Sequence, residues 1–199
     1  MAFAVEKYPA AVRELLLPER VAALDAGSPN LAAKAKLAAL DRTALAAGRK
    51  LRDPKMADAA LAGLWLLHDF LTESHELSQE IHTRTGSFWH AIMHRREQDF
   101  GNSKYWWNRT GDHEAFATLH EAAKVEFSRK PTTATESTRA FAPLEIQQLI
   151  AAPRWEPVRF VDLCEAARGG DRELQRACRT LQTIEWQTLF DYSMSAAFE

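Results

Sequence analysis

The residues best suited to chemistry lie together in one stretch, GSFWHAIMHRREQDFGNSKYWWNR, residues 86–109. His90 and His94 are four residues apart, so on a helix both imidazoles share one face. This is the spacing by which a single helix offers two ligands to one metal ion. Glu97 falls beside the pair, but WHAIMHRRE lacks the general base of the metalloprotease motif HExxH. The pair therefore indicates either metal ligation or acid–base chemistry.

A metal ion at this helix needs a third ligand, and the candidates are His75, Glu97 and Asp99. Neutral imidazole and carboxylate ligands suit zinc, iron, manganese or nickel. The periodicity places His68 and His75 on one helix, about 10 Å apart along its axis, so only one of them can join the site. His75 lies nearer the stretch and is the preferred third metal ligand beside the histidine pair. His68 is expected to be a core residue.

The same stretch also fits a metal-free pocket for a small polar or anionic molecule. Cationic side chains would neutralise the ligand, aromatic side chains would form a stacking wall, and a histidine oriented by a carboxylate would act as acid or base. The catalytic candidates are His90, His94, Glu97 and Asp99. The candidates for ligand binding are His75, Gln79, Arg95, Arg96, Asn102, Lys104, Tyr105, Trp106 and Glu185.

Three functions remain open on these residues. The first is an enzyme that acts on a small polar or anionic metabolite in a central pocket. The second is a helical-bundle hydrolase or oxygenase that uses His90 and His94 to bind a divalent metal ion. The third is a non-catalytic ligand-binding or scaffold protein, in which the same polar groups would satisfy one another.

Buried charges are expected on two helices. Arg96 lies against an apolar helix face with Arg95 beside it, and Glu185 lies in the apolar stripe between Leu181 and Thr188. A buried charge needs a partner of opposite sign. The plain alternative to a ligand-binding role is therefore a structural Arg–Glu pair that joins the two helices.

Helical periodicity runs through almost the whole chain, and no stretch alternates convincingly as a strand. Pro54 marks the first turn of one long helix, in which Asp69, Glu73 and Glu76 form a stripe expected to face water. Ser87 and Asp112 are expected to cap later helices, with a break at Gly101-Asn102 between them. The expected helices cover residues 10–24, 31–48, 54–79, 88–98, 112–128, 144–151, 157–168 and 171–192.

These elements predict an all-α fold, a single-domain helical bundle of about seven to nine helices over residues 1–199. The length suits one domain with its own core. The polar, Thr-rich segment 130–143 is expected to be an exposed loop.

The composition excludes some partners. The chain carries 25 Lys and Arg against 27 Asp and Glu, a net charge of -2, so no field favours nucleic acid or an anionic membrane. No apolar run approaches the ~20 residues of a membrane span, and the N-terminus lacks a signal-peptide pattern. Cys164 and Cys178 belong to no CxxC motif. We therefore expect a cytoplasmic protein whose partner is a small-molecule ligand; the oligomeric state stays open.

The segment SHELSQEIHTRTGSFWHAIMHRREQDFGNSKYWWNRTGDH, residues 74–113, resembles a family of uncharacterised bacterial and fungal proteins. Their shared pattern is SHxxSQ, then WHxIMHRRExDxxNxKYW, then GxH, and the segment IEWQTLFDY is also similar to theirs. The resemblance names no activity. It supports the choice of His75, Ser78, Gln79, His90, His94, Arg95, Arg96, Glu97, Asp99, Asn102, Lys104, Tyr105, Trp106 and His113. A weaker similarity, confined to the HxxxH pair, connects the chain to DinB-like bundles, which hold a metal with three histidines.

Overall fold

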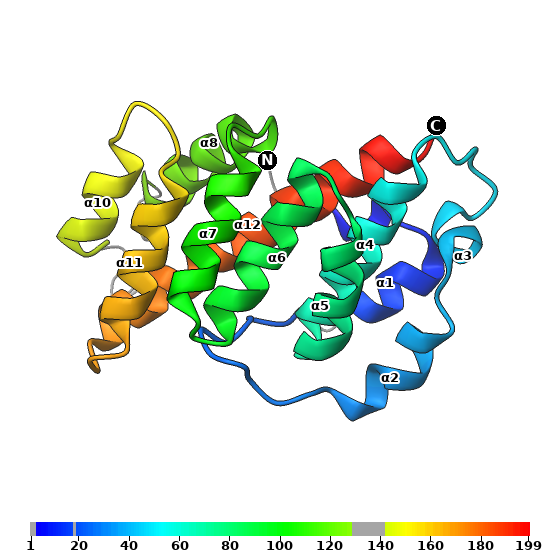
Figure 1. The fold of residues 1–199 in the computed structure, drawn as a ribbon, viewed down its shortest axis with the longest axis horizontal. Helices are drawn as coiled ribbons and strands as arrows, with labels where there is room; N and C mark the ends of the chain where they lie inside the picture. The colour runs from blue at the N-terminus through cyan, green and yellow to red at the C-terminus, as the bar shows by residue number, and fades with distance from the viewer. Residues whose placement is uncertain (1–2, 18, 129–141) are drawn as a thin grey trace.

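The computed structural model describes residues 3–17, 19–128 and 142–199, and these residues form an all-α structure (Figure 1). They contain eleven α-helices, one short 3-10 helix and no strand longer than an isolated bridge between Leu51 and Phe198. The predicted all-α class is confirmed, and the predicted number of helices is slightly low. The loop predicted at 130–143 lies outside the described residues except for its last two.

The first part of the chain is less helical than its periodicity predicts. It forms η1 (Val5–Lys7), α1 (Ala10–Leu16), α2 (Leu31–Ala38) and α3 (Arg42–Ala46). The helix predicted over 10–24 ends early because Leu17 is extended, at φ -117° and ψ 140°, and a residue before proline avoids the helical region. The helix predicted over 31–48 is divided, and Asp41 caps its second part by accepting a hydrogen bond from the Ala44 amide.

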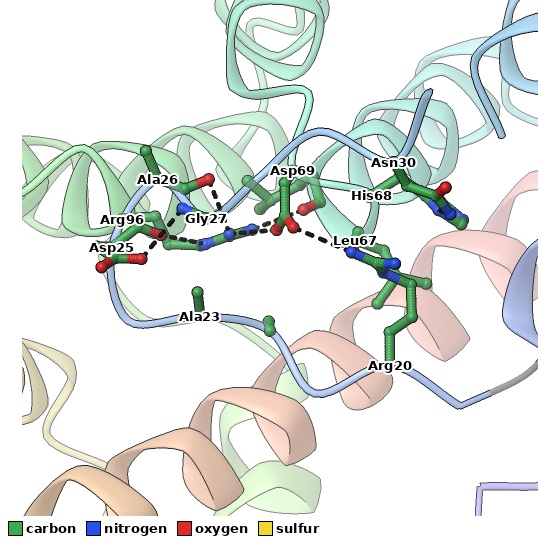
Figure 2. A network of polar contacts seen from close by, with 12 residues as sticks. Arg20, Ala23, Asp25, Ala26, Gly27, Asn30, Leu67, His68, Asp69 and Arg96 are labelled. Atoms are coloured by element: carbon green, nitrogen blue, oxygen red, sulfur yellow. Dashed lines mark hydrogen bonds and ion pairs between the residues drawn. The ribbon is translucent and has the colours of Figure 1, made fainter. Parts of the chain in front are cut away.

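The single long helix predicted over 54–79 is two helices, α4 (Pro54–Leu67) and α5 (Leu71–Glu80). Asp69 lies between them with φ at 64°. Its side chain is buried instead of facing water, because it pairs with Arg96 and Arg20, as Figure 2 shows. The predicted water-facing stripe is therefore wrong at Asp69. His68 is a core residue as expected, and its Nε2 hydrogen bonds to the Leu15 carbonyl over 2.9 Å.

The central hairpin consists of α6 (Arg84–Arg96) and α7 (Phe100–Thr110). The cap of α6 is Thr83, whose hydroxyl accepts from the Gly86 amide over 3.1 Å, and not Ser87 as predicted. The turn between the helices also comes earlier than Gly101. Asp99 caps α7 after the left-handed Gln98 at φ 63°. The two helices are therefore joined by a very short connection, which sets them side by side (Figure 1).

The remaining helices are α8 (Ala115–Ser128), α10 (Leu144–Ile150), α11 (Pro157–Ala167) and α12 (Arg172–Ala197). The Ala115 amide at the start of α8 donates to His113 Nδ1 over 3.1 Å, so the predicted Asp112 cap is wrong. α12 runs along the length of the molecule (Figure 1) and packs against α4, α8 and α11. None of the helices in the described part of the chain is both long and apolar enough to cross a membrane.

Two tryptophans, Trp186 and Trp89, pack against Gly63 at the centre of the fold. Trp186 Nε1 donates to the Gly63 carbonyl over 2.8 Å. A Cβ atom at Gly63 would lie 2.7 Å from the ring of Trp89. Because Gly63 has no side chain, α4 approaches both α6 and α12 closely and places α6 in the core.

Gly86→Ala is expected to lower the free energy of unfolding by about 1–3 kcal/mol or more, the range for forced overpacking. A Cβ atom there would lie 2.0 Å from the Ile81 carbonyl oxygen, and backbone cannot rotate away as a flexible side chain can. The measurement is urea unfolding followed by circular dichroism. Gly101→Ala is the matched control, because its nearest neighbour would be Asp99 Oδ1 at 3.8 Å. Equal stability of the two variants would contradict the close approach.

Candidate metal centre

Three histidines from two adjacent helices converge at one point. α5 supplies His75, and α6, which packs against α5 and α7, supplies His90 and His94. One ring nitrogen from each histidine can be chosen so that all three lie within 4.8 Å of one another. Imidazole nitrogens bind zinc at about 2.0–2.1 Å, so small side-chain rotations would bring all three to one ion. The predicted metal ligands are thus brought together.

The environment of His90 favours a proton on its Nδ1 atom. Ser78 Oγ donates to the His75 carbonyl over 3.2 Å. With its own proton used in this way, the same oxygen can accept from His90 Nδ1, which lies 3.4 Å away. A proton on Nδ1 leaves a lone pair on Nε2, the arrangement in which a histidine binds a metal.

The environment of His94 has the same effect. Its Nδ1 atom lies 3.2 Å from Glu97 Oε2, although without the alignment of a good hydrogen bond. An ionised carboxylate can only accept, so Glu97 also favours the proton on Nδ1 and the lone pair on Nε2. Glu97 therefore lies on the side of the His94 ring opposite the cluster and orients the ligand instead of binding the ion itself.

These arrangements direct two Nε2 lone pairs at each other, because His90 Nε2 and His94 Nε2 are 3.0 Å apart. Either one ring changes tautomer and gives up its Nδ1 partner, or a cation binds both nitrogens. Extra protonation is disfavoured: burial lowers the pKa of His90 to about 3, with His94 and His75 contributing. Burial also lowers the pKa of His94, against the opposing effect of Glu97. The neutral cluster suits a metal cation.

α7 contributes an aromatic wall to the cluster. Trp106 stacks on His90 with ring centres 4.0 Å apart and planes at 23°. Tyr105, which is exposed, contacts Trp106 edge to face at 5.6 Å. Arg109, which was not among the predicted site residues, lies over both rings. Its spacing of three residues from Trp106 and four from Tyr105 is the sequence pattern that could have identified it as part of this wall.

Arg95 does not face the imidazoles in this structure. Its guanidinium is fully buried and pairs with Glu185 of α12, with a further hydrogen bond to Gln182. The expectation that Arg95 and Glu185 bind a ligand is therefore corrected, because each uses the other as its partner. The structural Arg–Glu pair that was the alternative is what the structure contains, and it joins α6 to α12.

Arg96 is also directed to protein acceptors. Its guanidinium donates to Asp69 and to the carbonyls of Leu66, Asp25 and Ala26 (Figure 2). These contacts hold the irregular segment 19–30 against α4 and α6. The predicted role of Arg96 in neutralising a ligand is corrected for the same reason as that of Arg95: its hydrogen-bond donors are engaged inside the protein.

The remaining predicted residues lie on the surface around the hairpin. Lys104 pairs with Asp162 of α11 over 2.6 Å, so its charge is directed away from the imidazoles. Asp99 accepts hydrogen bonds from the backbone and side-chain nitrogens of Asn102, which makes both residues parts of the α7 cap. Gln79 is exposed on α5 one turn beyond His75.

A cavity of about 480 Å³ lies elsewhere, lined in part by His113, His120 and Trp155. His113 Nε2 is 3.1 Å from the Thr85 hydroxyl, and its Nδ1 accepts from the Ala115 amide. His120 Nε2 hydrogen bonds to the Ile150 carbonyl over 2.9 Å. Both ring nitrogens of His113 are therefore engaged by protein groups, whereas only Nε2 is engaged at His120.

Comparison of the chain with protein-family models, with curated proteins and with solved structures found no match. The resemblance of residues 74–113 to an uncharacterised family stays a prediction. The function is therefore inferred from the geometry of the histidine cluster.

Proposed function

We propose that the protein binds a divalent transition-metal ion, zinc foremost, through His75, His90 and His94, and that it is a metal-dependent hydrolase acting on a small substrate. The convergence of three imidazoles within 4.8 Å carries the proposal. The positions of Ser78 and Glu97 support it, because both favour the ring tautomer that a metal ligand needs.

The number of ligands favours a catalytic over a structural metal. Structural zinc sites are closed by four protein ligands, whereas catalytic sites use three and leave a position open. His75 is only half-buried, so the cluster lies near the surface of the helical layer, where a substrate can reach it. A metal held here would supply Lewis-acid polarisation of a substrate bond and activation of water.

The ligand type favours hydrolysis over oxygenation. Non-haem iron oxygenases typically use two histidines and one carboxylate, whereas an all-histidine set is one of the sets of catalytic zinc. The carboxylate of Glu97 faces His94 Nδ1 and is not part of the cluster. The chain's own residues then have distinct tasks. Ser78 and Glu97 orient the ligands, and Trp106 covers one face of His90.

The test is metal content after loading with zinc and extensive dialysis, measured by mass spectrometry. Wild-type protein should retain near-stoichiometric zinc, and His90→Ala and His94→Ala should each retain almost none, because two imidazoles bind far more weakly than three. His82→Ala is the control, since His82 is an exposed histidine between α5 and α6. Circular dichroism checks that each variant is folded. Zinc absent from wild type, or unchanged in folded variants, would rule out the site.

A further inference from the structure

We infer that Arg109 binds an anionic group of the substrate, so that the site accepts small molecules carrying a carboxylate or phosphate close to the bond that is hydrolysed. The inference rests on the proposed metal site, and it assigns a substrate class and a specificity residue to it. Arg109 would hold one end of the substrate while the histidine-bound metal holds the other.

The charge of Arg109 is available to a ligand. Arg109 is exposed, and within the described residues its contacts are with Tyr105 and Trp106 and with no carboxylate. The other cations of the hairpin are engaged by the protein: Arg95, Arg96 and Lys104 each pair with a carboxylate, and Arg84 donates to the carbonyl oxygen of Asp112. Within the part of the chain that the structure describes, no carboxylate therefore neutralises the charge of Arg109 beside the aromatic wall.

The Arg109 side chain is also held in place before any ligand arrives. Its Cζ atom lies 5.2 Å from the Trp106 ring centre and 5.9 Å from that of Tyr105. Nη1 donates to the Tyr105 hydroxyl over 3.4 Å. Stacking of this kind favours arginine over lysine, and a guanidinium that is already ordered loses less entropy when it binds a carboxylate or phosphate.

Trp106 connects Arg109 to the metal ligands. The same indole that lies under Arg109 stacks on His90 at 4.0 Å, so the guanidinium and the cluster flank one side chain. Because both distances end on the Trp106 ring, the Arg109 Cζ atom, 5.2 Å from its centre, and the His90 ring centre, 4.0 Å from it, are at most about 9 Å apart. A substrate with an arm of two or three carbons between its anionic group and its metal-binding group spans such a separation.

The acidic residues near the cluster support this orientation. Glu97 and Asp99 lie at the His94 end of the hairpin, next to the turn between α6 and α7. Arg109 is close to the opposite end of α7, which ends at Thr110. An anionic group would be repelled from the turn and attracted toward Arg109, so the charges favour one direction of binding along the hairpin.

The test uses two hydroxamates that differ by a carboxylate. Acetohydroxamate carries only the metal-binding group, and succinate monohydroxamate adds a carboxylate two carbons away. Each is titrated into cobalt-loaded protein, and binding is read from the visible absorption of the metal. Wild type should bind the charged probe roughly tenfold more tightly than the neutral one, a preference typical of one charge-assisted contact near the surface. Arg109→Gln should lose this preference and keep its affinity for acetohydroxamate.

Arg179→Gln is the matched control, because it removes one exposed positive charge from α12 and should keep the preference. A preference that persists in Arg109→Gln, or that is absent from metal-loaded wild type, would overturn the role of Arg109 and leave the metal site standing. Failure of the wild type to bind cobalt or zinc would instead overturn the metal site and, with it, this inference.

Discussion

Glu185→Ala is expected to lower the free energy of unfolding by about 3–5 kcal/mol, because it leaves a buried charge without its partner. Arg95 and Glu185 are both fully buried, and they join α6 to α12. Burial raises the pKa of the Glu185 carboxyl, against the opposing effect of Arg95, which shows how costly an unpaired charge would be at this position. Urea unfolding followed by circular dichroism measures the change.

The double variant Arg95→Met/Glu185→Leu separates the cost of an unpaired charge from the value of the pair. Replacing a buried ion pair by apolar residues of similar size is often neutral or stabilising, so the double variant should recover most of the lost stability. Glu121→Ala is a surface control, since the Lys124–Glu121 pair is exposed and worth at most about 1 kcal/mol. If Glu185→Ala lowers the free energy of unfolding by less than about 1 kcal/mol, Arg95 and Glu185 do not form a buried ion pair.

Asp69→Gly is expected to lower the free energy of unfolding by about 3 kcal/mol, near the low end for a broken buried pair. Asp69 accepts from Arg96 over 2.5 Å and from Arg20 over 3.0 Å. Arg96 keeps its backbone carbonyl acceptors, which limits the loss. Glycine is chosen because φ at Asp69 is 64° and glycine adopts this conformation without strain. The measured loss in free energy of unfolding then reflects the removal of the Asp69 carboxylate and not a strained backbone.

The matched control for Asp69→Gly is Asp58→Ala, which breaks the exposed pair with Arg42. It should cost at most about 1 kcal/mol. Because Arg96 also binds the segment 19–30, Asp69→Gly should increase amide hydrogen exchange in that segment more than Asp58→Ala does. Equal exchange in the two variants would show that Asp69 does not hold the segment in place.

The sequence by itself determined the features that depend on neighbours along the chain. The all-α class follows from periodicity, and the starts of α4, α10 and α11 follow from Pro54, Pro143 and Pro157, which suit a first helical turn or the residue before it. The shared face of His90 and His94 follows from their spacing of four. His75 was also selected correctly as the histidine beside them, since it precedes the turn that brings α5 back against α6.

Tertiary structure decided the features that depend on partners far along the chain. Asp69 lies on the expected water-facing stripe, yet it sits at a break between two helices and is buried, because it pairs with Arg96 and Arg20, which are far from it along the chain. The sequence identified Arg95 as a buried charge. Only the tertiary structure shows that its partner is Glu185 of α12. Arg109 shows the opposite case, because only the structure reveals that its charge has no carboxylate partner among the described residues. Pairing energies act between atoms in space, so local patterns identify charged groups but not their partners.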